Sequence, residues 1–204
     1  MKITEFNIEI CRENVFALID CYEDSATYED VVEEYEEMLP EAYKKIEPIA
    51  LLEFGDVEGF DLSRYGEGIR QALYCVTSVG AQLSQWSTQL FNEGDYLGGM
   101  LADAIADDYL FQMDHQLQPY IIAMCREKKC GVSHRLEAPQ DIPMEVQKKA
   151  LEVTGRENSA GIHVLDSCMY DPVKTTCQVY LTADHSDIFR IHPCELVHVE
   201  NRGG

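Results

Sequence analysis

Four aspartates in the middle of the chain are the first residues whose type and spacing could support chemistry. Asp103 and Asp107 are four residues apart, so they share one face of any helix that contains them, and two unpaired like charges there disfavour the helix. Asp108 and Asp114 continue the acidic stretch. This face either is solvated or binds a cationic or hydroxyl-rich ligand, and the residues alone leave both interpretations open.

An arginine and a short acidic segment are the other chemically interesting features. Arg135 lies in a predicted loop over residues 130–142. It either forms an ordinary surface ion pair or grips the carboxylate of a ligand with two parallel hydrogen bonds. Residues 166–172 read Asp-Ser-Cys-Met-Tyr-Asp-Pro between two predicted strands. This segment is either a polar turn that carries Met169 into the core or part of a ligand site.

The sequence patterns of common enzyme sites are missing from the chain. It has no Gly-rich phosphate loop ending in Lys-Ser/Thr, no Gly-x-Ser-x-Gly elbow and no His-Glu-x-x-His pair. The eight cysteines include no Cys-x-x-Cys pair, which disfavours a zinc site. We therefore expect reduced, half-buried thiols. A thiol or metal site at Cys168, Cys177 and Cys194 is the alternative.

The composition is that of a globular protein with a strongly acidic surface. The 204 residues are 46% hydrophobic and carry a net charge of −21, which repels phosphate backbones and argues against nucleic-acid binding. No apolar run approaches the roughly 18 residues that cross a bilayer, and no secretory signal is visible, so we expect a cytoplasmic protein without a membrane partner. Residues 1–61 hold 18 of the 37 acidic and 4 of the 16 basic residues. That excess is either a solubilising face or a docking surface for a basic partner.

Hydrophobic periodicity and turn residues predict the elements that position these groups. The expected strands are residues 6–10, 49–54, 72–79, 161–165, 175–182 and 188–199. The expected helices are one that follows Ser25 or Thr27, then 81–91, 95–118 and 143–153, with Pro119 breaking or kinking the long helix before a further segment to about residue 128. This order predicts an α+β fold with a largely antiparallel sheet. We expect a single domain over residues 1–204, with 1–61 as an acidic N-terminal lobe.

In their order along the chain, these segments resemble the activation (reactivation) domain of cobalamin-dependent methionine synthase and its free-standing bacterial relatives. Residues 94–107, with Gly-Asp-Tyr and later Ala-Asp-Ala-Ile-Ala-Asp, are similar to a helix of that family. Arg135 and the residues up to Lys149 are similar to its arginine loop and the following helix. Residues 166–177 are similar to its acidic-Ser-Tyr-x-Met-x-Pro segment and the strand after it. The likeness spans about residues 70–185.

This resemblance implies a curved antiparallel sheet flanked by helices, and binding of S-adenosylmethionine. It further implies support for the reductive methylation of a corrinoid. The cobalamin would be presented by a partner, either a corrinoid-binding protein or methionine synthase acting in trans. The implied ligand residues are Arg135 as a clamp for the methionine carboxylate, Asp166 as an acidic acceptor, and Ser167, Cys168 and Asp107 at matching positions.

The chain departs from the family pattern at two of these positions. After Arg135 it reads Leu-Glu-Ala-Pro-Gln-Asp, where the family has a Gly-Tyr pair, and Cys168 replaces a usual tyrosine. Without that glycine, the loop backbone is more restricted near a ligand. The alternative function is therefore a non-catalytic binding or regulatory module on the same fold that has lost S-adenosylmethionine.

Overall fold

The computed structural model describes residues 1–155, 161–184 and 191. Its centre is a five-stranded sheet in the order β1-β2-β3-β7-β4, in which every neighbouring pair is antiparallel. These strands are β1 (Lys2–Ile3), β2 (Ile49–Asp56), β3 (Gln71–Ser78), β4 (Gly131–Glu137) and β7 (Thr175–Ala183). A separate two-stranded ladder is formed by β5 (His163–Val164) and β6 (Tyr170–Asp171).

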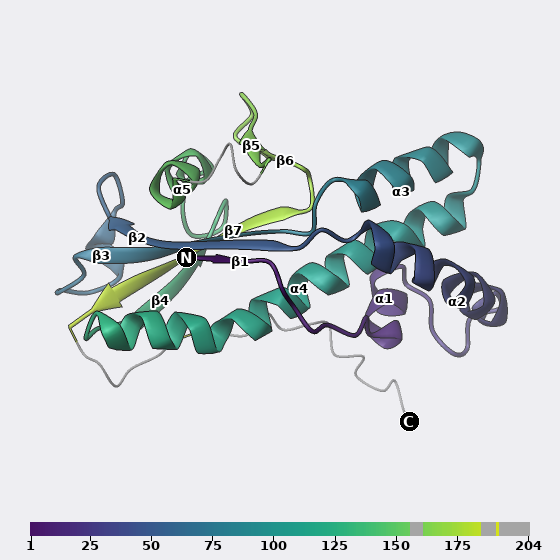
Figure 1. The fold of residues 1–204 in the computed structure, drawn as a ribbon, viewed down its shortest axis with the longest axis horizontal. Coiled ribbons are helices and arrows are strands. Elements are labelled where there is room, and N and C mark those ends of the chain that lie inside the picture. Colours follow the sequence, from purple (N-terminus) through teal and green to yellow (C-terminus); the bar gives the residue numbers. More distant parts are fainter. Residues whose placement is uncertain (156–160, 185–190, 192–204) are drawn as a thin grey trace.

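Helices cover both faces of the sheet and extend beyond one end of it (Figure 1). The helices are α1 (Arg12–Leu18), α2 (Tyr28–Lys45), α3 (Gln82–Glu93), α4 (Tyr96–Glu127) and α5 (Val146–Thr154). Figure 1 shows α5 with β5 and β6 on one face, the second half of α4 on the other, and α1, α2 and α3 around the first half of α4. The predicted α+β class, an antiparallel sheet flanked by helices, is confirmed.

Strand β3 shows how the sheet builds a core on each face. Tyr74 and Val76 pack with α5, whereas Leu73 and Cys75 pack with the second half of α4, and all four are fully buried. Successive strand residues point to opposite faces, so a strand covered on both sides needs apolar residues at every position. This requirement explains why β3 reads as a continuous apolar run.

A third core lies between the helices beyond the sheet. Phe16 of α1 and Tyr35 of α2 meet edge to face at 5.4 Å, and they pack with Leu83 of α3 and Ile105 of α4. The acidic helix α2 is thus anchored by its apolar face, while β1 and β2, which belong to the same residue range 1–61, lie in the sheet.

The strand predicted at residues 6–10 is wrong, although the alternation behind it is real. Ile8 and Ile10 are buried in the helical core, so the segment has an inner and an outer side. Its backbone groups bond to side chains instead of to a neighbouring strand. The Ile10 N–H donates to the Tyr43 hydroxyl at 2.9 Å, and the Gln112 amide donates to the Glu9 carbonyl at 2.9 Å.

Pro119 was expected to break or kink the long helix, and the break is wrong, because α4 continues through this residue to Glu127. Pro119 is exposed and lies between the fully buried Leu117 and Ile121. The missing N–H removes only one helical hydrogen bond, on a side where water reaches the carbonyl. Packing on both sides of the proline holds the helix together. The strand predicted at residues 188–199 lies outside the described residues.

Candidate functional site

Arg135 lies in β4, at the edge of the sheet, and not in the predicted loop. It is paired in register with Tyr180 of β7, and its side chain reaches α4. The guanidinium contacts the Asp114 carboxylate at 2.6 Å and the Glu137 carboxylate at 2.5 Å. The side chains of Arg135 and Asp114 are only 10% and 7% exposed. Arg135 is therefore the buried counter-ion of an α4 carboxylate.

The surroundings of this ion pair are apolar. Burial, with the Asp114 charge adding to it, raises the pKa of the Tyr180 hydroxyl well above its ordinary value, although Arg135 hydrogen-bonds that hydroxyl and opposes the shift. Burial likewise raises the pKa of the Cys75 thiol on the next strand. In such a site, the loss of one charged partner costs about 3–5 kcal/mol, because the other charge stays buried without compensation.

Asp107 forms a second ion pair, which links α4 to the start of β7. The Lys174 ammonium lies 2.8 Å from Asp107 and 3.0 Å from Asp103, and its side chain is 11% exposed. Burial raises the pKa of Asp107, while Lys174 lowers it and the neighbouring Asp103 charge raises it. Lys174 thereby offsets the repulsion that the four-residue spacing predicts.

The remaining aspartate of the α4 group holds the N-terminus of α1. Asp108 is fully buried and accepts from the Cys11 N–H at 2.8 Å, the Asn14 amide at 2.9 Å and the Gln112 amide at 2.7 Å. A carboxylate near the first N–H groups of a helix is favourably placed. All four aspartates on α4 thus have partners within the protein. Both interpretations made from the sequence, a solvated face and a ligand-binding face, left these internal partners out.

Residues 166–168 form the turn between β5 and β6. Asp166 and Ser167 are exposed, whereas Cys168 is buried with a φ of +64° and donates its N–H to the Leu165 carbonyl at 2.9 Å. Met169 is 48% exposed, so the expectation that the turn carries this side chain into the core is wrong. The buried neighbours are Cys168 and Tyr170.

The structure does not bring the five predicted ligand residues together. The Tyr170 hydroxyl next to this turn donates to the Gln147 carbonyl of α5 at 3.2 Å, which places the turn on the α5 face of the sheet. The Arg135 side chain instead contacts Asp114 of α4, and Figure 1 shows the second half of α4 on the opposite face of the sheet from α5. A hollow shared by Arg135 and Asp166, which the clamp for the methionine carboxylate requires, is not formed.

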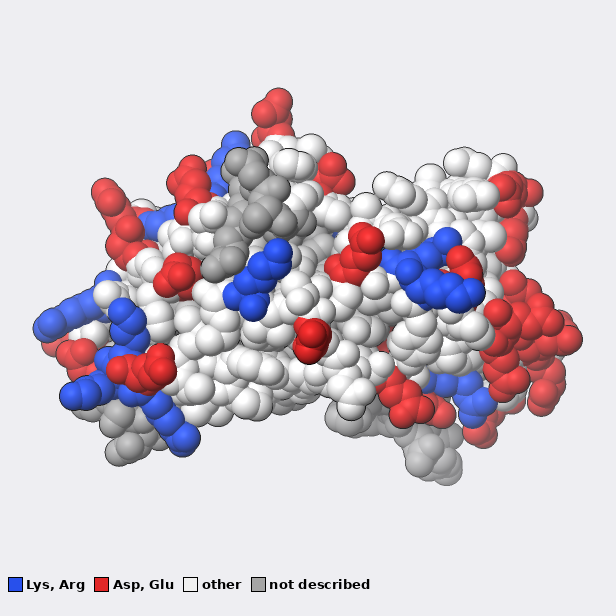
Figure 2. Space-filling model, in the orientation of Figure 1, with Lys and Arg blue, Asp and Glu red and all other residues white. Residues whose placement is uncertain are grey.

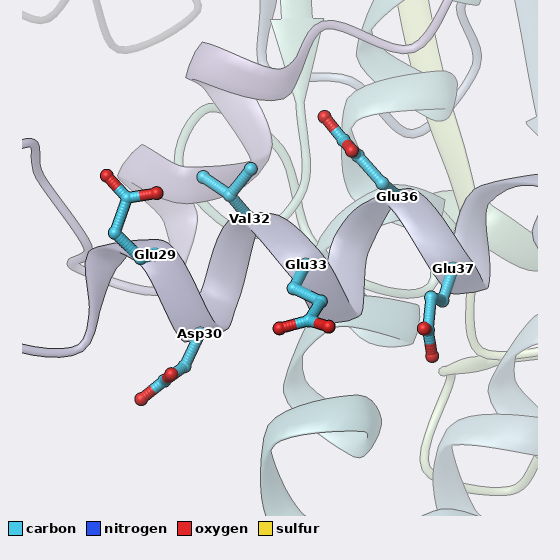
Figure 3. Close-up of a pocket in the computed structure, with 6 residues that line it drawn as sticks. All are labelled: Glu29, Asp30, Val32, Glu33, Glu36 and Glu37. Carbon is cyan, nitrogen blue, oxygen red and sulfur yellow. The ribbon is translucent and has the colours of Figure 1, made fainter.

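The acidic surface gathers on α2. Figure 2 shows acidic side chains crowded at the end of the molecule that α2 forms. A surface groove there is lined by Glu29, Asp30, Val32, Glu33, Glu36 and Glu37 (Figure 3). All six residues belong to one helix, and Figure 3 shows the carboxylates spreading away from it. Burial, followed by the nearby Asp95, Glu37 and Glu33 charges, raises the pKa of Glu34. This surface fits both a solubilising face and a docking face.

The alternative thiol or metal site gains no support from the described part of the chain. Among residues 1–155, 161–184 and 191, no three His, Cys, Asp or Glu side chains are placed to hold a metal ion. Burial raises the pKa of the Cys177 thiol to about 12, so this thiol is protonated and a poor nucleophile at neutral pH. Cys194 lies outside the described residues.

None of the described helices has the length and apolar character that crossing a membrane requires.

The same fold occurs in a solved structure. The MetH reactivation domain bound to AdoHcy superimposes with a TM-score of 0.53 at 13% sequence identity, and the match covers 81% of this chain and 69% of that one. At this identity the likeness shows the fold, and the resemblance inferred from the sequence therefore holds for the fold. No family model and no curated protein matches the sequence.

Proposed function

We propose that this protein is an accessory module of a corrinoid-dependent methyl-transfer system. It docks in trans on a cobalamin-binding protein or on methionine synthase. Two observations support the proposal. The fold resembles the MetH reactivation domain over 81% of the chain, and the segments around residues 94–107, 135–149 and 166–177 follow the order of the activation-domain family.

We further propose that docking does not depend on S-adenosylmethionine held by Arg135. The ion pair between Arg135 and Asp114 is the observation that carries this choice. To grip a ligand carboxylate, the guanidinium would have to leave Asp114, at a cost of about 3–5 kcal/mol. Two parallel hydrogen bonds to a ligand carboxylate return about 3–6 kcal/mol, which does no more than offset this cost. The ion pair therefore competes directly with a ligand carboxylate for Arg135, and Lys174 occupies Asp107 in the same way.

A second candidate function is binding of an S-adenosyl compound at other residues. It is favoured by one observation: the similar solved structure, the MetH reactivation domain, is bound to AdoHcy. Under this alternative the ligand is recognised without the Arg135–Asp166 clamp, and the protein takes part in methyl transfer as a component of the methyltransferase.

Calorimetry with S-adenosylmethionine and with AdoHcy distinguishes the two candidates. The proposal predicts no binding heat for the wild-type protein at millimolar ligand. Binding that survives Arg135→Ala supports the second candidate. Binding that is lost in an Arg135→Ala protein shown by circular dichroism to be folded at the assay temperature, but kept in Arg70→Ala, a variant of an exposed arginine, restores the clamp and contradicts our choice.

Docking is tested separately with the cobalamin-binding domain of a bacterial methionine synthase loaded with hydroxocobalamin. Immobilised on a biosensor, this domain should bind the wild-type protein with micromolar affinity and without added S-adenosylmethionine. If the two proteins do not bind each other, either with or without S-adenosylmethionine, the docking proposal is wrong, whatever the calorimetry gives.

A further inference from the structure

The C-terminus of α4 ends in a turn that has a cysteine on each side. The Cys130 N–H donates to the Cys125 carbonyl at 3.0 Å, and the Lys129 N–H donates to the Arg126 carbonyl at 3.0 Å. Lys129 has a φ of +57°, in the left-handed region. This pair of hydrogen bonds with a left-handed residue between them is the Schellman motif, which usually has glycine at the left-handed position.

The Schellman motif brings the side chains on either side of the turn into contact, and here both are thiols. Cys130 Sγ lies 3.5 Å from the Cys125 carbonyl, and the two thiols hydrogen-bond to each other. Cys125 is fully buried and Cys130 is 9% exposed, both in the core between α4 and the sheet. Since the backbone already holds the two residues together, joining the sulfurs calls for side-chain rotation and little backbone movement.

We propose that Cys125 and Cys130 are a redox modification site that a small disulfide such as glutathione disulfide converts to an intramolecular disulfide. The segment between them is basic, with Arg126, Lys128 and Lys129, in a protein whose net charge is −21. Figure 2 shows basic side chains gathered at the end of the molecule where α4 ends. These cations attract an anionic disulfide to the turn.

The reaction is two successive thiol–disulfide exchanges. Cys130, the more exposed thiol, loses its proton and attacks one sulfur of glutathione disulfide, forming a mixed disulfide and releasing one glutathione thiolate, which takes up a proton. The Cys125 thiolate then attacks the Cys130 sulfur and expels the second glutathione. The two cysteines lose two electrons and two protons, and glutathione disulfide is reduced to two glutathione molecules.

Access to the first thiol comes from local opening of the turn. A left-handed conformation costs a residue with a side chain roughly 1–2 kcal/mol, so Lys129 weakens the motif it closes. Helix ends open more readily than helix centres. The second step is limited by Cys125, because burial, with Cys130 adding to it, raises the pKa of this thiol to about 12. The closing rate should therefore rise as the pH is raised from 7 to 9.

Peptide mapping of the full chain after incubation with excess glutathione disulfide tests the proposal. Trypsin cleaves after Arg126, Lys128 and Lys129, and chymotrypsin cleaves after aromatic residues such as Trp86 and Tyr120, so digestion with both places Cys75, Cys125 and Cys130 on separate peptides unless a disulfide joins them. We expect a joined peptide, a mass decrease of two hydrogen atoms in the intact protein, and full reversal by dithiothreitol. Cys11→Ser, which changes a partly exposed thiol elsewhere, should keep the joined peptide, and Cys130→Ser should abolish it.

Three outcomes overturn the proposal. The first is that Cys125 and Cys130 stay reduced in the folded wild-type protein under conditions that join them in urea. The second is that Cys130 retains glutathione without closing. The third is that either residue pairs with a different cysteine. Wild-type protein alone gives all three readouts, so the test does not depend on the variants folding.

Discussion

Replacing Arg135 by alanine should strongly lower the free energy of unfolding, because Asp114 then stays buried without its counter-ion. The two side chains are 10% and 7% exposed and 2.6 Å apart. For a buried pair of this kind, loss of one partner lowers the free energy of unfolding by about 3–5 kcal/mol. In a chain of 204 residues this corresponds to a fall in Tm of roughly 10 °C.

The assay is urea unfolding followed by circular dichroism, with linear extrapolation to water. Asp114→Ala should lose less free energy than Arg135→Ala, because the guanidinium keeps its contact with the Glu137 carboxylate. The double variant Arg135→Met with Asp114→Leu replaces the pair by apolar side chains of similar size, and it should recover most of the loss. Arg70→Ala removes the same charge at an exposed position and should change the free energy of unfolding by less than about 0.5 kcal/mol.

A result near that of the control would refute this reasoning. If Arg135→Ala changes the free energy of unfolding by less than about 1 kcal/mol, the guanidinium does not depend on Asp114 and is available for a ligand. If the double variant does not recover the lost stability, the loss comes from packing of the arginine stem and not from the charge pair.

Three further substitutions give independent predictions. Burial raises the pKa of the Cys177 thiol from 9.0 to about 12, so between these values the folded thiol stays protonated while the unfolded thiol ionises. The contribution of this thiol to stability is therefore full below pH 9, and the free energy of unfolding falls by about 1.4 kcal/mol per pH unit above it. Cys177→Ala should remove this decrease from the free energies of unfolding measured in urea at pH 9–11. Pro119→Ala should stabilise α4 by about 1–3 kcal/mol by restoring a bond to the His115 carbonyl, and an unchanged Tm would contradict this. Lys129→Gly should stabilise the helix end by about 0.5–1 kcal/mol, seen as slower amide exchange there, and faster exchange would show that its left-handed conformation is unstrained.

The sheet was predictable where burial dictates the residue type. Strands β2, β3 and β7 begin and end within two residues of the predicted ranges, because each carries a run of buried apolar or β-branched residues that the sequence shows. Strand β4 was missed for the complementary reason. It lies at the edge of the sheet, and its register shifts between Val132 and His134, so neither a continuous apolar run nor a clean alternation marks it.

The site could be predicted only in part, since ion pairing joins residues far apart in the chain. Asp103 and Asp107, four residues apart on a helix, indicate that a cation is needed nearby. Nothing in the spacing identifies that cation as Lys174, or identifies Asp114 as the partner of Arg135, because the fold alone brings these residues together. A sequence motif locates candidate ligand residues, but it does not reveal which of them the protein has already neutralised.

A crystal structure of the protein grown with AdoHcy would show whether Arg135 takes part in ligand binding. Arg135 should remain on Asp114 of α4, with Asp166 exposed on the other face of the sheet and no ligand carboxylate against the guanidinium. A structure in which Arg135 has turned from Asp114 to a bound ligand, with Asp166 at the same ligand, would contradict this prediction.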